Sequence, residues 1–158
     1  LDGACASACP EADFCSTLLC NGPTLLAISE QNPLSSKPDL TLCDLREETF
    51  LFLILPQAED MSQSLQALCQ PYGFVPKCEM VSTSHWMLAD RIANNRGIHF
   101  FPHFVRASFE APGIVLRRMP GIGETPWLFF LTSREPSPDV APALSLFKHH
   151  LSETLSHL

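Results

Sequence analysis

The sequence predicts an α/β fold, and two observations carry this prediction. Short apolar runs typical of buried strands alternate along the chain with segments of helical periodicity. Residues 76–102 show the alternation most clearly, with a strand at 77–81, a polar turn, a helix up to Arg96 and an apolar run at 98–101 closed by Pro102. That run is typical of a buried parallel strand. Gly97 follows the helix and suits a left-handed C-cap.

The composition fits one compact domain or two small lobes. The chain has 158 residues, of which 46% are hydrophobic and 17% charged, enough to bury a core and too little charge for disorder. A formal net charge of −7 is a poor match for a phosphate backbone, so we do not expect this chain alone to hold nucleic acid. No apolar run approaches the roughly 20 residues of a membrane span, so we expect no membrane partner.

Further elements are predicted on both sides of residues 76–102. We expect strands at residues 1–8, 17–20, 24–29, 50–55, 114–119 and 127–132, and short helical segments at 41–48 and 102–109. Residues 58–70 place Met61, Leu65, Leu68 and Cys69 on one helical face. A terminal helix follows Ser137-Pro138, a favourable N-cap and N1 pair.

The cysteines and the first residues of the chain indicate its cellular compartment and its relation to a longer polypeptide. Of seven cysteines, four lie near the start, at Cys5, Cys9, Cys15 and Cys20. A metal site, a disulfide pair and free thiols are the alternatives, and the irregular spacing favours free thiols in a reducing cytoplasm. Cys43, Cys69 and Cys78 lie in apolar patterns, as small core residues do. The first residues show no signal peptide, and the abrupt start indicates a fragment of a longer polypeptide.

The candidate ligand site lies at the turn before the central helix. Ser82, Thr83 and Ser84 offer three hydroxyl groups where capping the helix needs only one. Helix N–H groups at the carboxyl edge of an α/β sheet bind anions, and His85 in the first turn is favourable only near an anion. Gln57 follows another strand at the equivalent edge. The predicted ligand-binding residues are Ser82, Thr83, Ser84, His85, Gln57, Phe101 and Pro102.

No catalytic motif, metal site or cofactor motif is evident, so we expect no enzyme. The chain has no glycine-rich phosphate loop, no His-Glu-x-x-His and no Gly-x-Ser-x-Gly elbow. His149, His150 and His157 fit a solvated face of the terminal helix. His99 and His103 flank Pro102, and a hydrogen-bonded structural role is favoured over a place in a cleft.

Several spaced motifs together resemble one family. They are Asn32-Pro33-Leu34, Leu42, Asp44-Leu45 and Glu48-Thr49-Phe50, then Gly73-Phe74-Val75-Pro76, Ser82 to Ser84 with Leu88 and Ile92, Gly97-Ile98, Phe100-Phe101-Pro102, and Phe129 to Thr132 with Arg134, Pro138 and Phe147. Their order and spacing resemble the effector-binding domain of bacterial LysR-type transcriptional regulators. The resemblance covers roughly residues 25–158 and, more weakly, residues 1–4.

The resemblance implies a fold like that of type 2 periplasmic binding proteins, with two subdomains crossed twice by the chain. Residues 1–30 and 123–158 would form subdomain I, and residues 31–122 subdomain II. Pro120 to Pro126, with Gly121 and Gly123, would be the return crossing. The opening strand and helix of subdomain I have no counterpart here, so we expect that subdomain to be incomplete. Cys69 lacks a partner cysteine on the preceding loop, which does not support a redox sensor.

The resemblance also implies a function. A small anionic effector would bind in a cleft between the subdomains, in a cytoplasmic homo-oligomer. DNA would be held only through a winged helix-turn-helix that is absent from this chain. The alternative is a stand-alone solute-binding or interaction module of the same fold that does not bind DNA. A signal peptide upstream would favour that alternative.

Overall fold

The protein consists of two compact units, which are described separately. The computed structural model describes residues 3–6, 14–54, 58–119, 122, 125–133, 138–139 and 141–155. Unit 1 comprises Leu1–Gly22 and Glu124–Leu158, and unit 2 comprises Pro23–Gly123. No helix within the described ranges is long and apolar enough to cross a membrane.

Unit 1 contains a three-stranded antiparallel sheet and a helix. The strands are β1 (Gly3–Ala6), β2 (Phe14–Gly22) and β8 (Thr125–Ser133), and the helix is α3 (Ala141–Leu155). Strand β8 lies between β1 and β2. Cys5 and Cys15 therefore lie on strands that are separated by β8.

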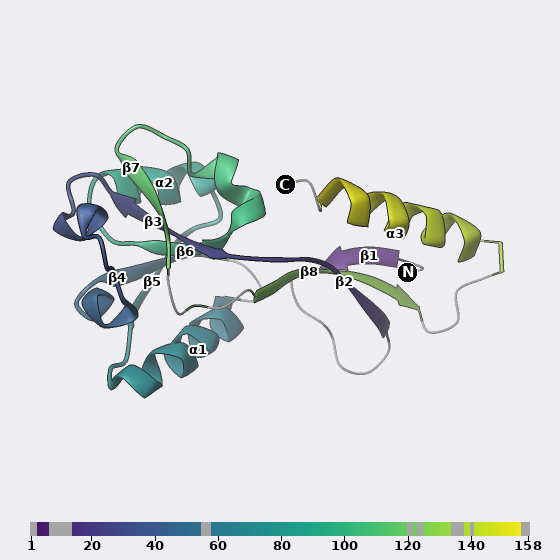
Figure 1. Ribbon diagram of the computed structural model, residues 1–158, viewed down its shortest axis with the longest axis horizontal. Coiled ribbons are helices and arrows are strands. Elements are labelled where there is room, and N and C mark those ends of the chain that lie inside the picture. Colours follow the sequence, from purple (N-terminus) through teal and green to yellow (C-terminus); the bar gives the residue numbers. More distant parts are fainter. Residues whose placement is uncertain are drawn as a thin grey trace. The chain divides into compact units, whose positions relative to one another are not determined.

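Unit 2 is built on a mixed sheet (Figure 1). Its strands are β3 (Thr24–Ser29), β4 (Thr49–Leu53), β5 (Lys77–Ser82), β6 (His99–Pro102) and β7 (Ile114–Arg118). Strands β6, β3 and β7 pair antiparallel in that order, while β4 and β5 pair in parallel. A parallel bridge between Phe50 and Ile98 joins the two groups. The predicted boundaries placed residues 24–29 in the first subdomain, whereas β3 lies in the middle of this sheet.

The prediction that residues 98–101 form a buried parallel strand is wrong in its pairing. Strand β6 is antiparallel to β3, and only a single bridge makes it parallel to β4. The apolar character of the strand reflects burial on both faces. Ile98 contributes to one core cluster and Phe101 to the other. A strand that is covered on both faces, such as β6, can therefore pair antiparallel with its neighbour.

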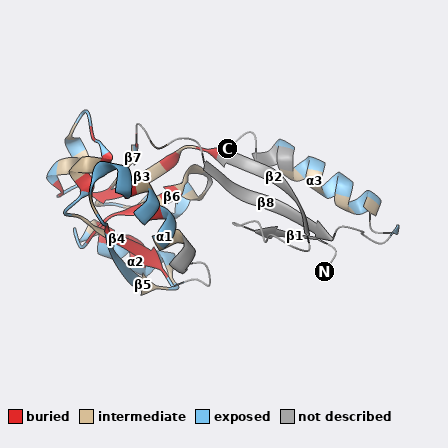
Figure 2. Ribbon diagram, turned by 90° about the horizontal axis from the view of Figure 1, so that it is seen from below, coloured by how far each residue is buried: buried red, intermediate tan, exposed pale blue. Residues whose placement is uncertain are grey.

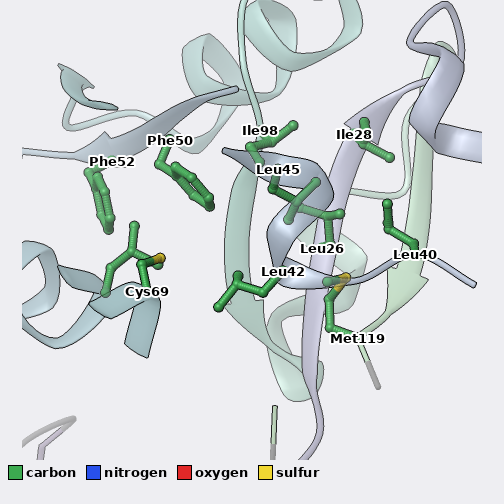
Figure 3. Close-up of a cluster of buried hydrophobic side chains, with 11 residues drawn as sticks. Leu26, Ile28, Leu40, Leu42, Leu45, Phe50, Phe52, Cys69, Ile98 and Met119 are labelled. Atoms are coloured by element: carbon green, nitrogen blue, oxygen red, sulfur yellow. The ribbon is translucent and has the colours of Figure 1, made fainter. Parts of the chain in front are cut away.

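Two helices cover the opposite faces of this sheet. Helix α1 (Ala58–Cys69) packs on the face that carries Phe50 and Phe52, and α2 (His85–Ala93) packs on the face that carries Leu51 and Leu53. Figure 3 shows Cys69 at the end of α1 beside Phe52. The alternation along β4 explains its continuous apolar sequence, since every side chain of a strand covered on both sides must be buried.

Short 3-10 helices complete unit 2. They are η1 (Pro33–Ser36), η2 (Leu42–Leu45), η3 (Gln70–Tyr72) and η4 (His103–Ser108). Segments η2 and η4 confirm the short helices expected at residues 41–48 and 102–109. In η2, the Asp44 carboxylate accepts hydrogen bonds from the Thr41 backbone N–H and from Lys37 Nζ. These bonds, led by the one from Lys37, lower the pKa of Asp44 to about 2.

The prediction that Cys43, Cys69 and Cys78 are core residues is wrong for Cys78. Cys69 is fully buried, as expected of a core thiol, and burial together with the nearby Cys78 raises its pKa to about 11. Cys43 is half-buried, but Cys78 is exposed. The reason is topological, because β5 pairs only with β4 among the described strands and so lies at the sheet edge, where Figure 2 shows largely exposed residues.

Gly97 does not cap the central helix, contrary to the sequence-based expectation. Helix α2 ends at Ala93, and the left-handed residue after it is Asn95, with φ 54°. Gly97 has φ 153°, and a Cβ there would lie 2.5 Å from the Thr49 carbonyl oxygen and 2.8 Å from Leu51 Cγ. Glycine is therefore needed because β4 passes too close for a side chain.

Replacing Gly97 by Ala should destabilise the protein markedly. Gly73→Ala is the matched control, because Gly73 also has a positive φ, 75°, but open space around it. We expect Gly97→Ala to lose at least about 2 kcal/mol more unfolding free energy than Gly73→Ala, measured by urea denaturation. Equal losses would show that β4 and residue 97 do not approach this closely.

His99 is a structural histidine of β6, as the favoured interpretation held. Its Nδ1 lies 2.8 Å from the Leu51 carbonyl oxygen, which can only accept, so Nδ1 carries the proton of the neutral ring. The ring stacks on Phe101 and contacts Phe109, with centroid distances of 6.2 and 5.2 Å. Burial lowers the pKa of His99 to about 4, a shift reinforced by His85 and opposed by the Leu51 hydrogen bond.

The depressed pKa of His99 predicts a pH-dependent stability. The unfolded chain would take up this proton near pH 6.5, but the folded protein only near pH 4. The contribution of His99 is therefore complete above pH 6.5 and is lost as the pH falls through this window, by about 3 kcal/mol at most. We expect His99→Asn to remove this part of the pH dependence of the unfolding free energy. Parallel pH profiles for both proteins would contradict the assignment.

Candidate functional site

The carboxyl ends of β4 and β5 meet at one edge of the sheet in unit 2. The Ile54 backbone N–H donates to the Ser82 carbonyl oxygen at 2.8 Å, so the two strand ends are directly bonded. Ser82 ends β5 and leads through Thr83 and Ser84 into α2. This confirms the predicted order of strand, hydroxyl turn and helix.

The hydroxyl turn is held together by Ser82 rather than by a helix cap. The Ser84 backbone N–H donates to Ser82 Oγ at 3.0 Å, and Ser82 Oγ lies 3.3 Å from Met87 Sδ. Ser84 occupies the N-cap position in extended backbone conformation, but its side chain makes no cap hydrogen bond. The Ser82 hydroxyl therefore stabilises the turn, and the side chains of Thr83 and Ser84 remain available to a ligand.

The start of α2 offers hydrogen-bond donors. The first N–H groups of a helix have no intrahelical acceptor, and Ser84 does not supply one from its side chain. No acidic residue lies in the first turn of α2. The helix macrodipole adds a positive partial charge of roughly half a unit at this end. A small anion is the kind of ligand that such an end attracts.

A cavity of about 570 Å³ opens at this helix start. Its walls come from two segments, the beginning of α2 and the end of η4. The lining residues are Thr83, Ser84, His85, Trp86, Ala107, Ser108, Glu110 and Ala111. Trp86 is 82% exposed, so its indole is free to contact a ligand. The His85 ring lies edge-on to Phe109, 6.0 Å between centroids, which ties the two walls together.

Only some of the predicted ligand-binding residues line this cavity. Thr83, Ser84 and His85 do, and Ser82 supports them from the turn. Phe101 is fully buried, with its ring 4.5 Å from that of Phe109, so it belongs to the core. Pro102 ends β6 and does not line the cavity. Gln57 lies outside the described residues.

The second wall of the cavity was missed by the sequence-based prediction. Ser108 and Glu110 carry the polar side chains of this wall, and Trp86 on the α2 wall was not predicted either. A short helix was expected after Pro102, but nothing in the sequence placed it against α2. That placement follows from the antiparallel pairing of β6, which the sequence did not reveal.

The charge in the cavity comes from one carboxylate. Glu110 is the charged residue among those that line it, and its Oε1 accepts a hydrogen bond from Arg106 Nε at 2.6 Å. Both side chains of this pair are more than half exposed, so the pair contributes little to stability. No group of three His, Cys, Asp or Glu residues suited to a metal occurs within the described part of the chain.

Other histidines and a second cavity lie away from this site. His149 pairs with Glu153 on the exposed side of α3, at 3.4 Å, in keeping with a solvated helix face. His157 lies outside the described residues. A cavity of about 610 Å³ runs along α1, lined by Gln63, Gln66, Ala67, Gln70, Gly73, Phe74 and Val75. It contains none of the predicted residues.

Comparison with known proteins identifies bacterial transcriptional regulators that are similar in sequence. The transcriptional regulator MetR of Escherichia coli is 32% identical over 98 residues, or 62% of this chain and 30% of MetR. AlsR of Bacillus subtilis is 26% identical over 90 residues, or 57% of this chain and 30% of AlsR. The chain thus spans less than a third of the length of these regulators.

Solved structures of effector-binding domains are similar in fold to this chain. The effector-binding domain of QuiR in complex with shikimate superimposes with a TM-score of 0.76 and 15% identity, covering 97% of this chain and 72% of that domain. The BenM effector-binding domain with benzoate gives a TM-score of 0.72 and 18% identity, covering 98% and 72%. Likeness at such identities confirms the predicted α/β fold of these domains, related to type 2 periplasmic binding proteins.

The family itself follows from a match over most of the sequence. The model described as the LysR substrate binding domain covers residues 3–154. The chain therefore belongs to the LysR substrate-binding domain family, the non-enzymatic effector-binding part of LysR-type regulators.

Proposed function

We propose that this domain senses a small anionic metabolite that binds at the start of α2. The single observation that carries the proposal is the cavity at an uncapped helix N-terminus, lined by Thr83, Ser84 and His85. Shikimate and benzoate, the molecules bound by the QuiR and BenM domains, both carry a carboxylate. A carboxylate is also the group that helix N–H donors and hydroxyls would hold here.

The proposed role is regulatory. A ligand that binds one conformation better than another shifts the population toward it, and no bond needs to be made or broken. In a LysR-type regulator this shift would be passed to DNA by a winged helix-turn-helix. The charge of −7 is consistent with such a division of labour, because it disfavours direct contact with phosphates. A homo-oligomer in the cytoplasm is part of the same proposal.

A thermal-shift screen of small carboxylates, each with its neutral amide, tests the proposal. Benzoate with benzamide and shikimate with its amide are the first pairs. We expect at least one carboxylate to raise the unfolding temperature while its amide does not, because the helix start favours negative charge. Amides that bind as well as their acids would contradict an anion site.

Substitutions in the hydroxyl turn locate the site for any carboxylate found. We expect Thr83→Ala and Ser84→Ala each to weaken binding about three- to tenfold, the effect of losing one hydrogen bond. Ser82→Ala should also weaken binding, because it frees the Ser84 N–H and loosens the turn. Ser64→Ala on the exposed side of α1 is the control, and calorimetric titration gives the affinities. Unchanged affinity in all three turn variants would show that the ligand binds elsewhere.

A further inference from the structure

We propose that the ligand of the α2 cavity is zwitterionic, an α-amino acid or a similar amino carboxylate; this inference rests on the proposed function. The cavity is not uniformly suited to an anion. Its α2 wall offers N–H and hydroxyl donors, but its other wall presents the carboxylate of Glu110. A simple carboxylate would be attracted by the first wall and repelled by the second. A ligand that also carries an ammonium group satisfies both.

The indole of Trp86 supports the proposal that the ligand carries an ammonium group. Trp86 is 82% exposed in the first turn of α2, beside the exposed Met87, whereas Leu88 and Ile92 on the opposite side of the helix are fully buried. The face of an indole attracts a cation within about 6 Å. Trp86 and Glu110 line the same cavity, so an ammonium group there would find both a carboxylate and an aromatic face.

The Arg106–Glu110 pair leaves Glu110 able to take part. Arg106 Nε bonds one carboxylate oxygen, Oε1, at 2.6 Å, and Arg106 itself does not line the cavity. The remaining oxygen can accept a hydrogen bond from a ligand ammonium. Because the pair is exposed, removing either partner should change the charge of the cavity without unfolding the domain.

Substitutions of Glu110 and of Arg106 should have opposite effects on affinity, and the direction of each effect should differ between amino acids and plain carboxylates. For an amino acid, Glu110→Gln should weaken binding about tenfold or more, while Arg106→Gln should leave it unchanged or tighten it, because Glu110 gains freedom. For the matched carboxylate without the amino group, Glu110→Gln should tighten binding and Arg106→Gln should weaken it. Glu47→Gln is the control, since Glu47 forms a similar exposed pair with Lys77 in the same unit.

The experiment compares amino acids with their deamino analogues on the intact chain. Phenylalanine with 3-phenylpropanoate and leucine with 4-methylpentanoate are suitable pairs, followed by the other natural amino acids, using thermal shift and then calorimetric titration. We expect an amino acid to bind at least about tenfold more tightly than its analogue, and Glu110→Gln to abolish this preference.

The outcomes separate this inference from the proposed function. If analogues and other plain carboxylates bind as well as amino acids, or if Glu110→Gln leaves the preference unchanged, the zwitterion assignment is overturned while an anion site stands. If neither class binds, both are overturned. Trp86→Leu adds a check, because it should weaken binding of the amino acid more than that of its analogue.

Discussion

The main-chain contact between β4 and β6 is the constraint on which unit 2 depends. The Leu51 N–H donates to the Ile98 carbonyl oxygen at 2.8 Å, and the Ile98 N–H donates to the Thr49 carbonyl oxygen at 2.9 Å. These two bonds join a parallel pair of strands to an antiparallel group of three. They also require the chain after α2 to approach β4 so closely that only glycine fits at position 97. Without this contact, the two hydrophobic clusters would lose their common sheet.

The candidate site follows from this arrangement. Strand β5 continues into α2, and α2 must return to the β4–β6 junction, so the start of the helix is left at the carboxyl edge of the sheet. Strand β6 then turns into η4, which places Ser108 and Glu110 opposite the start of α2. The buried contacts of His99, Phe101 and Phe109 hold η4 against this face. The cavity is therefore supported by a rigid core, although its own residues are largely exposed.

Local features of the fold could be predicted from the sequence. Strand β3 occupies residues 24–29 as predicted, and the helical face of α1 is correct because Leu65 and Cys69 are buried with Phe50 and Phe52. These patterns depend on periodicity within one element. The turn of Ser82, Thr83 and Ser84 was likewise recognisable, because hydroxyl residues before a helical pattern have a local physical reason.

Features that depend on strand pairing could not be predicted. The apolar run at 98–101 has the same composition whether its neighbours are parallel or antiparallel, so the pairing of β6 and the position of η4 were not accessible. Glu110 therefore gave no sign that it faces α2. Phe101 was among the predicted ligand-binding residues, but its ring is fully buried in the core. A glycine after a helix was interpreted as a C-cap, whereas the structure shows that Gly97 is needed because β4 approaches its backbone closely.

The most direct test of the central claim, that the start of α2 binds the effector, is a residue-resolved NMR titration. The isotope-labelled chain would be titrated with the tightest carboxylate or amino acid identified by thermal shift. We expect the largest shifts at the backbone amides of His85, Trp86 and Met87 and at the Trp86 indole N–H, because these donors would bond to the ligand or contact it. Shifts confined to residues along the α1 cavity, such as Gln66 and Gln70, would contradict the assignment.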